Sequence, residues 1–526
     1  MKRLQPSANR LHPSILGQRL SALAAAILAA LLSVSCGGEA PLDPDVITIA
    51  MPSSPSNLDP RVGVDEASVR VHQMVYDSLF ENDENLRVAP GLATHWDMPD
   101  DLTYVVHLRD GIRFHDGREL SSRDVVYTFA SFLDTEFVSP RKGAFTLLSS
   151  VRSLDARTVE FKLKQPFGSF PVNLVMQIVP DGSGPSLLDR PNGTGPYQFV
   201  SIAPDDKVVL KANPHYFRGA PLNSGVVLKI VPDEIMRGLE LRKGTVDMVV
   251  NDLPPDVAYQ LDQDERLQLV TSPGTDYMYL GLNLRDRALS DLRVRQAISY
   301  AIDREAIVKY LRRGFAQPAV GILPPRAWAF EPNVMTYPHD PARARRLLDN
   351  AGFPDPDGDG PLPRLNLSLK VSTVEQYRLQ ATVIQQDLKQ VGINLDVRSY
   401  ELATLFADVL KGTFQIVSMQ WVGITDPDVL RRVFHSSQVP PSGWNRGFYH
   451  NPDVDRLIDA ATVSTDEAER RRLYAETQRL LAEDLPYISL WNKTNMAVAQ
   501  SNLEGIHLPP ATDFTFLRSV RRVFHN

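Results

Sequence analysis

The sequence predicts an α/β protein with more than one domain, and two observations support this prediction. Strand and helix patterns alternate along the second half of the chain: residues 294–312 have the apolar spacing of a helix, 366–371 of a strand, 375–391 of a helix and 394–400 of a strand. The chain also has 526 residues, more than one hydrophobic core usually organises. Two or three domains are therefore expected.

The first half of the chain adds more elements of both kinds. Residues 46–50 are rich in β-forming side chains and lead into a turn-forming stretch, 52–60. Residues 65–80 have the apolar spacing of an amphipathic helix, and a second helix is expected to begin at Ser121. Further segments predict short strands and one more helix: strands at 103–108, 159–163, 197–199, 208–211, 226–231 and 277–283, and a helix at 235–243.

Residues 1–36 have the pattern of a secretion signal. A basic region ends at Arg19, an apolar stretch follows over 20–32, and small residues lead to Cys36, the only cysteine of the chain. This arrangement resembles a bacterial lipobox, although Ser33 stands where Leu is usual. We expect Cys36 to be acylated and to anchor the protein to a membrane. The alternative is a plain signal peptide with an incidental cysteine.

Charge and composition exclude some classes of partner. The formal net charge is −7, and it falls to −11 without residues 1–36, which hold four basic and no acidic side chains. A nucleic-acid partner is not expected, because neutralising phosphates requires clustered Lys and Arg. A content of 43% hydrophobic and 23% charged residues is typical of a globular protein.

Motifs of enzymes are absent from the sequence. It has no Gly-x-Ser-x-Gly elbow, no His-Glu-x-x-His and no Walker A loop, and its one cysteine lies in the signal. We therefore expect no enzymatic activity and no cofactor. A transport role would need a separate ATPase, since the chain has no phosphate loop.

Metal binding is not expected either, with one question left open. Asp355, Asp357 and Asp359 alternate as in the opening of a calcium loop, but Asn366 stands at the twelfth position, where a bidentate Glu is required. An acidic surface turn is favoured over a calcium site. His107 and His115 flank a turn and are interpreted as structural residues rather than as nickel ligands, because the sequence has no compact histidine cluster.

Several motifs in a fixed order resemble one family. Together they resemble the peptide, oligopeptide and nickel solute-binding proteins of ABC importers, known as bacterial extracellular solute-binding proteins of family 5. The motifs that carry the resemblance run through nearly all of the mature chain: 57–60, 75–79, 102–117, 193–197, 213–217, 294–304, 351–352, 412–414, Trp421, 426–427 and 451–458.

The resemblance implies a periplasmic-binding-protein-like fold, with two lobes around a ligand cleft and an extra inserted domain. After the signal at 1–36, domain I would comprise 37–65, 190–275 and 500–526, domain II would be an insertion at 66–189, and domain III would be the opposing lobe at 276–499. The implied protein is periplasmic or at the cell surface, and its partners are an ABC permease with its ATPase.

The resemblance also implies where the ligand binds. In this family the segment around Trp421 and the loop after the first strand line the ligand. The candidate ligand-binding residues are therefore Ser54, Asn57, Trp421, Gly423, Thr425 and Asp426, with Tyr277, Trp328 and Asn445 as further candidates. For the aromatic candidates, the alternative is a place in the core or at a domain interface.

The expected ligand is a short peptide, but one departure from the family bears on it. Peptide binders of this family commonly place an aspartate two to three residues after the tryptophan, where it pairs with the ligand's amino group. Here the first acid after Trp421 is Asp426, and the apolar Ile424 cannot balance an ammonium group. Either Asp426 takes that role or the ligand has no free amino terminus. The alternatives are an oligosaccharide, a metal chelate, or a membrane-tethered sensor with the same fold.

Overall fold

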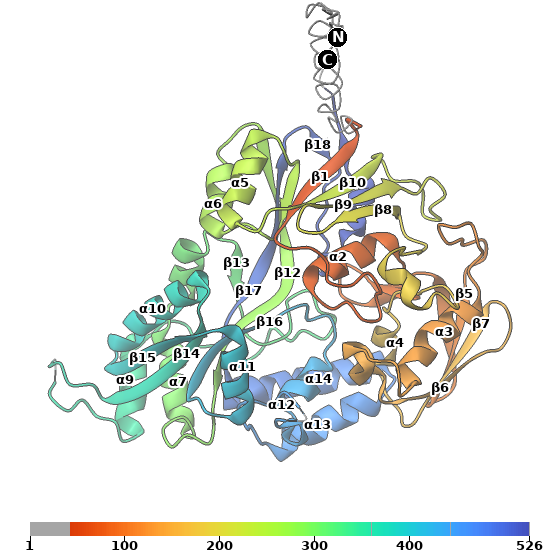
Figure 1. Cartoon of the computed structure of the whole chain (residues 1–526). Coiled ribbons are helices and arrows are strands. Elements are labelled where there is room, and N and C mark those ends of the chain that lie inside the picture. Colours follow the sequence, from red (N-terminus) through yellow and green to blue (C-terminus); the bar gives the residue numbers. More distant parts are fainter. Residues whose placement is uncertain (1–42, 359, 442, 525–526) are drawn as a thin grey trace, which may run out of the picture. The chain divides into compact units, whose positions relative to one another are not determined.

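The computed structural model describes residues 43–358, 360–441 and 443–524 (Figure 1). The predicted signal, Cys36 and Asp359 of the acidic turn lie outside the described residues. Among the residues described, no helix combines the length and hydropathy needed to cross a membrane.

One large mixed sheet, of eleven strands within the described residues, organises most of the chain and confirms the α/β prediction. Ten of these strands lie side by side in the order β15 (Ile393–Tyr400), β14 (Leu365–Ser372), β16 (Ile416–Trp421), β12 (Leu267–Leu282), β17 (Tyr487–Gln500), β11 (Met248–Val250), β1 (Val46–Met51), β10 (Gly225–Ile230), β9 (Lys207–Ala212) and β8 (Tyr197–Ala203). The short eleventh strand, β13 (Ala316–Pro318), pairs with β17.

Two long antiparallel strands join the halves of this sheet. β12 and β17 pair from Leu267 opposite Gln500 to Gly281 opposite Tyr487, and the register shifts between Pro273 and Tyr277. β16 pairs with the second half of β12, whereas β11 pairs with the far end of β17 (Figure 1). The predicted boundary between domains I and III, at residue 275, therefore falls inside one continuous strand, near its irregularity.

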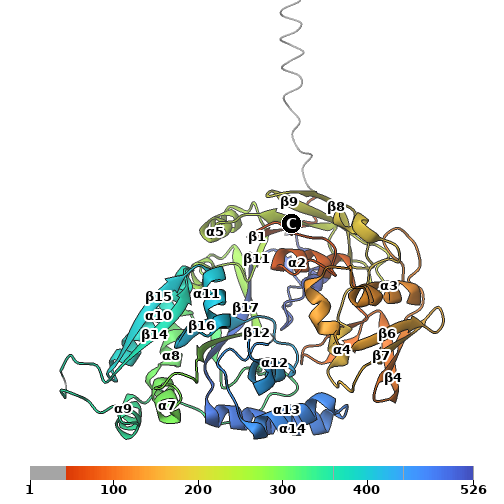
Figure 2. The same cartoon turned by 60° about the horizontal axis from the view of Figure 1, so that its bottom comes forward.

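A second sheet of four antiparallel strands lies between residues 93 and 163 (Figure 2). Its order is β4 (Ala93–Asp100), β5 (Thr103–Leu108), β7 (Thr158–Leu163) and β6 (Leu148–Ser153). α3 (Ser122–Leu133) begins as predicted, with a reciprocal capping box between Ser121 and Asp124. Its Phe129 packs edge-on against Phe161 of β7, with ring centroids 5.0 Å apart. This sheet and its core lie inside the stretch predicted as an inserted domain.

The remaining helices flank the two sheets. They are α2 (Glu66–Val75), α4 (Phe170–Asn173), α5 (Glu234–Lys243), α6 (Pro255–Leu261), α7 (Leu292–Ala301), α8 (Arg304–Ala306), α9 (Pro341–Asn350), α10 (Glu375–Lys389), α11 (Leu402–Lys411), α12 (Val429–Phe434), α13 (Pro452–Val463) and α14 (Glu467–Asp484). The predicted helices at 235–243 and 375–391 agree closely with α5 and α10.

Two predicted helices are shorter in the structure. The helix expected over 294–312 ends at Ala301, because Ile302 is extended and the Asp303 carboxylate caps a new start by accepting from the Ala306 backbone. The chain continues as one π-helical stretch, Ile307–Leu311. The helix expected over 65–80 ends at Val75, because Tyr76 is extended. Strand β2 (Phe80–Asn82) follows it.

The hydrophobic core is divided into several clusters. One cluster gathers residues 79–178 around the four-stranded sheet, a second lies on residues 278–491, and a third combines Leu86 with residues 277–487. A further cluster combines residues 47–250 with 497–520, so the C-terminal tail packs with β1. Val71, Tyr76 and Val179, from the stretch predicted as domain II, also belong to this last cluster. The domain boundaries remain a prediction.

Candidate ligand-binding site

A cavity of about 660 Å³ lies between two segments that are far apart in sequence. Residues 140–147 and 165–176 line one side, and 428–444 with Thr462 line the other. The first group contains α4 and the 3-10 turn Pro140–Phe145, and the second contains α12. Figure 2 shows α4 and α12 near each other. The volume is typical of a small-molecule site.

Aromatic rings form one wall of this cavity. Trp444 lines it with 42% of its surface exposed. Its ring stacks on Trp421, at the end of β16, with centroids 5.2 Å apart. Trp421 in turn lies parallel to Tyr279 at 6.2 Å, and the Arg446 guanidinium sits 4.8 Å from its ring centre. Trp421 therefore supports Trp444, the ring that reaches the cavity.

Charged groups from both sides face the cavity. Four charged side chains line it: Arg141, Asp428, Arg431 and Arg432. Arg432 Nε donates to Asp428 Oδ2 at 3.0 Å, and Arg431 pairs with Asp459 on α13. The lining is therefore cationic on balance.

Two of these groups retain unused hydrogen-bonding atoms. Arg141 donates to the Gly63 carbonyl at 3.1 Å, but no carboxylate among the described residues pairs with it, and its buried Nε has no acceptor there. Burial lowers the pKa of Arg141 from its ordinary value. Asp428 Oδ1 is likewise buried without a donor among the described residues. Both residues line the same cavity, and the two atoms without a partner in the described part of the chain are themselves buried beside it.

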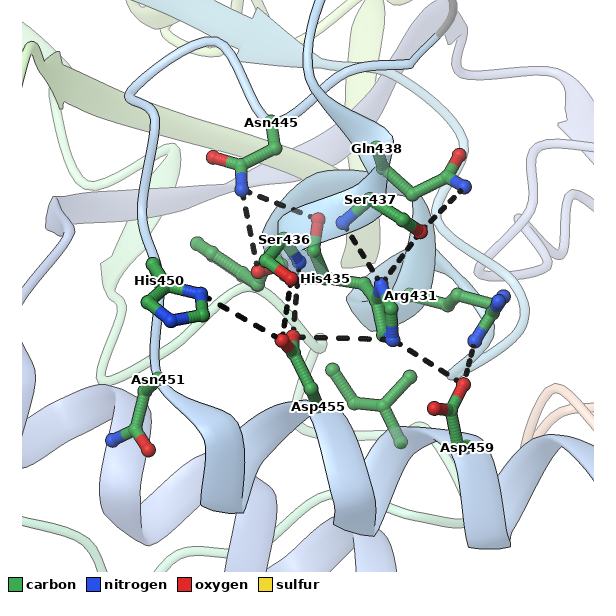
Figure 3. Close-up of polar contacts among 12 residues, drawn as sticks. Arg431, His435, Ser436, Ser437, Gln438, Asn445, His450, Asn451, Asp455 and Asp459 are labelled. Carbon is green, nitrogen blue, oxygen red and sulfur yellow. Dashed lines mark hydrogen bonds and ion pairs between the residues drawn. The ribbon is translucent and has the colours of Figure 1, made fainter.

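A polar network holds the segment that carries Trp444 (Figure 3). The Ser436 backbone donates to Asp455 on α13 at 2.9 Å, and the Ser436 hydroxyl donates to the same carboxylate. His435 Nδ1 accepts from the Ser437 backbone, and its Nε2 lies 3.3 Å from Asp459. This network ties residues 435–437 to α13.

Asp459 is the charged centre of that network. Burial alone would raise the pKa of Asp459, but hydrogen bonds from Arg431 and His435 outweigh burial and hold the pKa below its ordinary value. An ionised Asp459 keeps Arg431 in place beside the cavity. The position of this wall therefore depends on α13.

The buried side chain of Asn445 makes hydrogen bonds to the backbone of the same segment. It is 1% exposed, its amide donates to the Tyr449 and His435 carbonyls, and its Oδ1 accepts from the Tyr449 backbone. The residue holds the turn after Trp444, and ligand contact by Asn445 remains a prediction.

The predicted segment after Trp421 is outside the described lining of the cavity, and Gly423 in it is exposed. Gly423 has φ of +66°, and its N–H donates to Asp276 Oδ1 at 3.0 Å. Asp426 Oδ1 accepts from the Ser169 hydroxyl and the Asp428 backbone, both at 2.8 Å. Burial raises the pKa of Asp426. Thr425 lies between them, half-buried.

Among the other predicted residues, Tyr277 lies opposite Trp421 in the pairing of β12 with β16, and Trp328 belongs to the same hydrophobic cluster as Tyr277. Ser54 Oγ accepts from the Asp205 backbone, and the Asn57 carbonyl is 2.9 Å from His72 Nε2, both in the loop after β1. Trp328 packs edge-on against Tyr474. Tyr277 lines a second cavity of about 440 Å³, and its hydroxyl is 2.7 Å from Ser489 Oγ.

None of the nine predicted residues is among the described residues that line the larger cavity. Their ligand contacts remain predictions. Sequence reasoning missed Arg141, Asp428 and Trp444. Trp444 adjoins the predicted Asn445, and Asp428 follows the predicted Asp426 by two positions, so both had a signal nearby. No predicted residue lies near Arg141 in the sequence, because only the fold places Arg141 on the same cavity as Asp428.

Comparison with known proteins places the chain in a family. Residues 87–440 match the sequence model described as bacterial extracellular solute-binding proteins, family 5 middle. The glutathione-binding protein GsiB of Salmonella typhi is 30% identical over 487 residues, which cover 89% of this chain and 93% of the relative.

Solved structures agree with this match. The oligopeptide-binding protein AppA from Bacillus subtilis, in complex with a nonapeptide, is 28% identical with a TM-score of 0.74, covering 91% of this chain and 99% of that one. NikZ from Campylobacter jejuni, in complex with Ni(L-His), is 28% identical with a TM-score of 0.76, covering 91% and 100%. The predicted fold is confirmed, and the chain belongs to the bacterial extracellular solute-binding proteins of family 5.

Proposed function

We propose that this protein captures a short peptide in the 660 Å³ cavity and delivers it to an ABC permease driven by a separate ATPase. Family membership supports the binding role, and relatives named for glutathione and oligopeptides support the ligand class. On this proposal the protein binds and releases its ligand without chemical change.

The observation that carries the proposal is the pair of unsatisfied groups, Arg141 and Asp428. A buried polar or charged group without a partner is costly, and a ligand that supplies the partner recovers that cost. A peptide with free ends carries a carboxylate and an ammonium group. Its carboxylate would accept from Arg141, and its ammonium group would donate to Asp428 Oδ1.

Asp428 is a candidate partner for the ligand's amino group, which the aspartate missing two to three residues after Trp421 would otherwise bind. The carboxylate of Asp426 already accepts from Ser169 and from a backbone N–H, whereas Asp428 keeps one oxygen without a donor among the described residues. We therefore assign the amino-group role to Asp428 rather than to Asp426.

The charge of the lining bears on which peptide binds. Arg432 pairs with Asp428 and Arg431 with Asp459, so Arg141 is the cation of the described lining without a carboxylate partner, and it favours a ligand that carries a carboxylate. Glutathione has two carboxylates and one ammonium group, which makes it the first ligand to test. The described lining contains no His or Cys, the usual protein ligands of a directly coordinated nickel ion, so the proposal includes no metal coordination by this lining.

We also propose that the protein works outside the cytoplasm as a lipoprotein anchored through Cys36. Its support is the signal pattern, the single cysteine and membership of an extracellular family. An anchor would keep the loaded protein near its permease.

The test is calorimetric titration of the purified protein with glutathione and a neutral tripeptide, each free, N-acetylated or C-amidated. Arg141→Gln should weaken binding of free peptide at least tenfold and leave C-amidated peptide unaffected. Asp428→Asn should weaken binding of free peptide at least tenfold and leave N-acetylated peptide unaffected. Exposed Arg123→Gln and Asp101→Asn are matched controls. If both cavity variants bind every form as tightly as the wild type does, the proposed site is wrong.

A further inference from the structure

The β4–β5 hairpin brings two histidines and an aspartate together on one face of the four-stranded sheet. His95 lies directly opposite His107 in the register, and Asp97 follows His95 by two residues. Side chains two positions apart on a strand point to the same face. The neighbouring Trp96 and Val106 point the other way, toward the core, where Trp96 packs against Phe80 at 4.9 Å.

The ligating atoms of these three side chains all lie within 4.8 Å of one another. The imidazole rings stack with centroids 4.4 Å apart, and His107 Nε2 is 2.9 Å from the Asp97 carboxylate. His95 Nδ1 is 2.9 Å from the Thr94 hydroxyl, which holds the ring by one nitrogen and leaves the other for a ligand.

We propose that His95, Asp97 and His107 form a binding site for a divalent first-row transition ion such as Zn²⁺. Two imidazole nitrogens and one carboxylate oxygen are a donor set that such ions accept, with water at the remaining position. His95 and Asp97 are exposed and His107 is half-buried, so an ion and its water can enter from solvent. Small rotations of the exposed rings would converge their nitrogens on one ion.

This site is separate from the cavity, whose described lining contains none of the three residues. β4 is an edge strand of its sheet. An ion held by β4 and β5 together would cross-link that edge to the next strand. The expected consequence is that the native protein becomes more stable as the ion concentration rises, with the logarithm of that concentration once it exceeds the dissociation constant.

The test is calorimetric titration of the metal-free full-length protein with Zn²⁺, with Co²⁺ absorption as a second readout. One ion should bind per chain, with a visible Co²⁺ band of a four- or five-coordinate site. His95→Ala, His107→Ala and Asp97→Asn should each weaken Zn²⁺ binding at least tenfold. His215→Ala, which removes an exposed histidine elsewhere, should not.

The three residues are at least partly exposed, so the variants should fold, which circular dichroism checks. The same variants should also lose the Zn²⁺-dependent rise in melting temperature. The proposal is overturned if the wild type binds no Zn²⁺, or if the His95→Ala/His107→Ala double variant binds Zn²⁺ as the wild type does. Peptide binding by the variants should be unchanged, so failure of this proposal is distinct from failure of the cavity assignment.

Discussion

Trp444 stacks on Trp421 with ring centroids 5.2 Å apart and an angle of 30° between the ring planes. Trp421 is the residue on which the family resemblance centres, but Trp444 is the one that lines the cavity. The contact places the Trp421 ring against the back of Trp444, outside the described lining of the cavity. It also assigns different roles to the two rings.

Truncation of Trp444 should affect binding more than stability. Trp444→Ala is expected to weaken peptide binding about tenfold or more, because truncating an aromatic hot-spot residue costs about 2 kcal/mol or more. The melting temperature should change little, since 42% of the side chain is exposed. Calorimetry and thermal melting measure the two effects. Tyr259→Ala is the control, because Tyr259 is 49% exposed and lies outside the cavity.

A set of contacts between residues 168–169 and the helices α13 and α14 should favour a closed cavity. The Gly168 N–H donates to the Thr462 carbonyl at 2.8 Å, and Arg470 donates to the Gly168 carbonyl at 2.9 Å. A Cβ at Gly168 would lie 2.0 Å from the Ser464 carbonyl oxygen. Gly168→Ala should therefore separate these segments, lower peptide affinity and increase the radius of gyration in solution scattering.

Gly321→Ala is the matched control, because a Cβ there meets no atom within 4 Å. If Gly168→Ala binds peptide as the wild type does and scatters identically, these contacts have no part in closure.

His72 should make stability depend on pH. Burial lowers the pKa of His72 to about 4, while the unfolded chain titrates near 6.5. Between these values the unfolded state binds more protons than the folded state, so stability falls as pH decreases from 6.5 to 4. The loss attributable to His72 should be about 3 kcal/mol.

His72→Gln should remove this part of the pH dependence. Urea unfolding of both proteins between pH 4 and 7 measures it, and the difference in unfolding free energy between them should change across that range. A constant difference would contradict the assignment to His72.

Cys36 should determine whether the protein partitions with membranes. Cells that express the wild type and are fed a labelled fatty acid should yield labelled protein in the membrane fraction. Cys36→Ala should be unlabelled and released, because no other cysteine is present. Equal labelling of both proteins would exclude an anchor at Cys36.

The sequence predicted secondary structure well where side-chain periodicity was strong. β14, α10 and β15 lie within two residues of the expected bounds, because each buries a regular apolar face. The helix predicted over 294–312 was too long, because periodicity does not show that Asp303 caps a new start. The pairing of β1 with β10 and β11, strands distant in sequence, had no local signal.

The candidate site was harder to predict than the fold. The family resemblance predicted Trp421 as a ligand-binding residue, whereas in the structure its stacking partner Trp444 lines the cavity. Arg141 and Asp428 are 287 positions apart, and the cavity they share depends on how the fold brings residues 140–176 near residues 428–444, not on any short motif. The metal site likewise depends on cross-strand register, which makes partners of His95 and His107.

The central claim, that a peptide with free ends fills the 660 Å³ cavity, is tested most directly by thermal melting of the purified protein against a ligand panel. The panel contains glutathione and neutral tri- to hexapeptides, each free, N-acetylated or C-amidated, with oligosaccharides as controls. A ligand at 100 times its dissociation constant stabilises a protein by about 2.7 kcal/mol, which a melt resolves. We expect free peptides to raise the melting temperature and blocked peptides to raise it less. A shift with oligosaccharides alone, or no shift with any peptide, would contradict the claim.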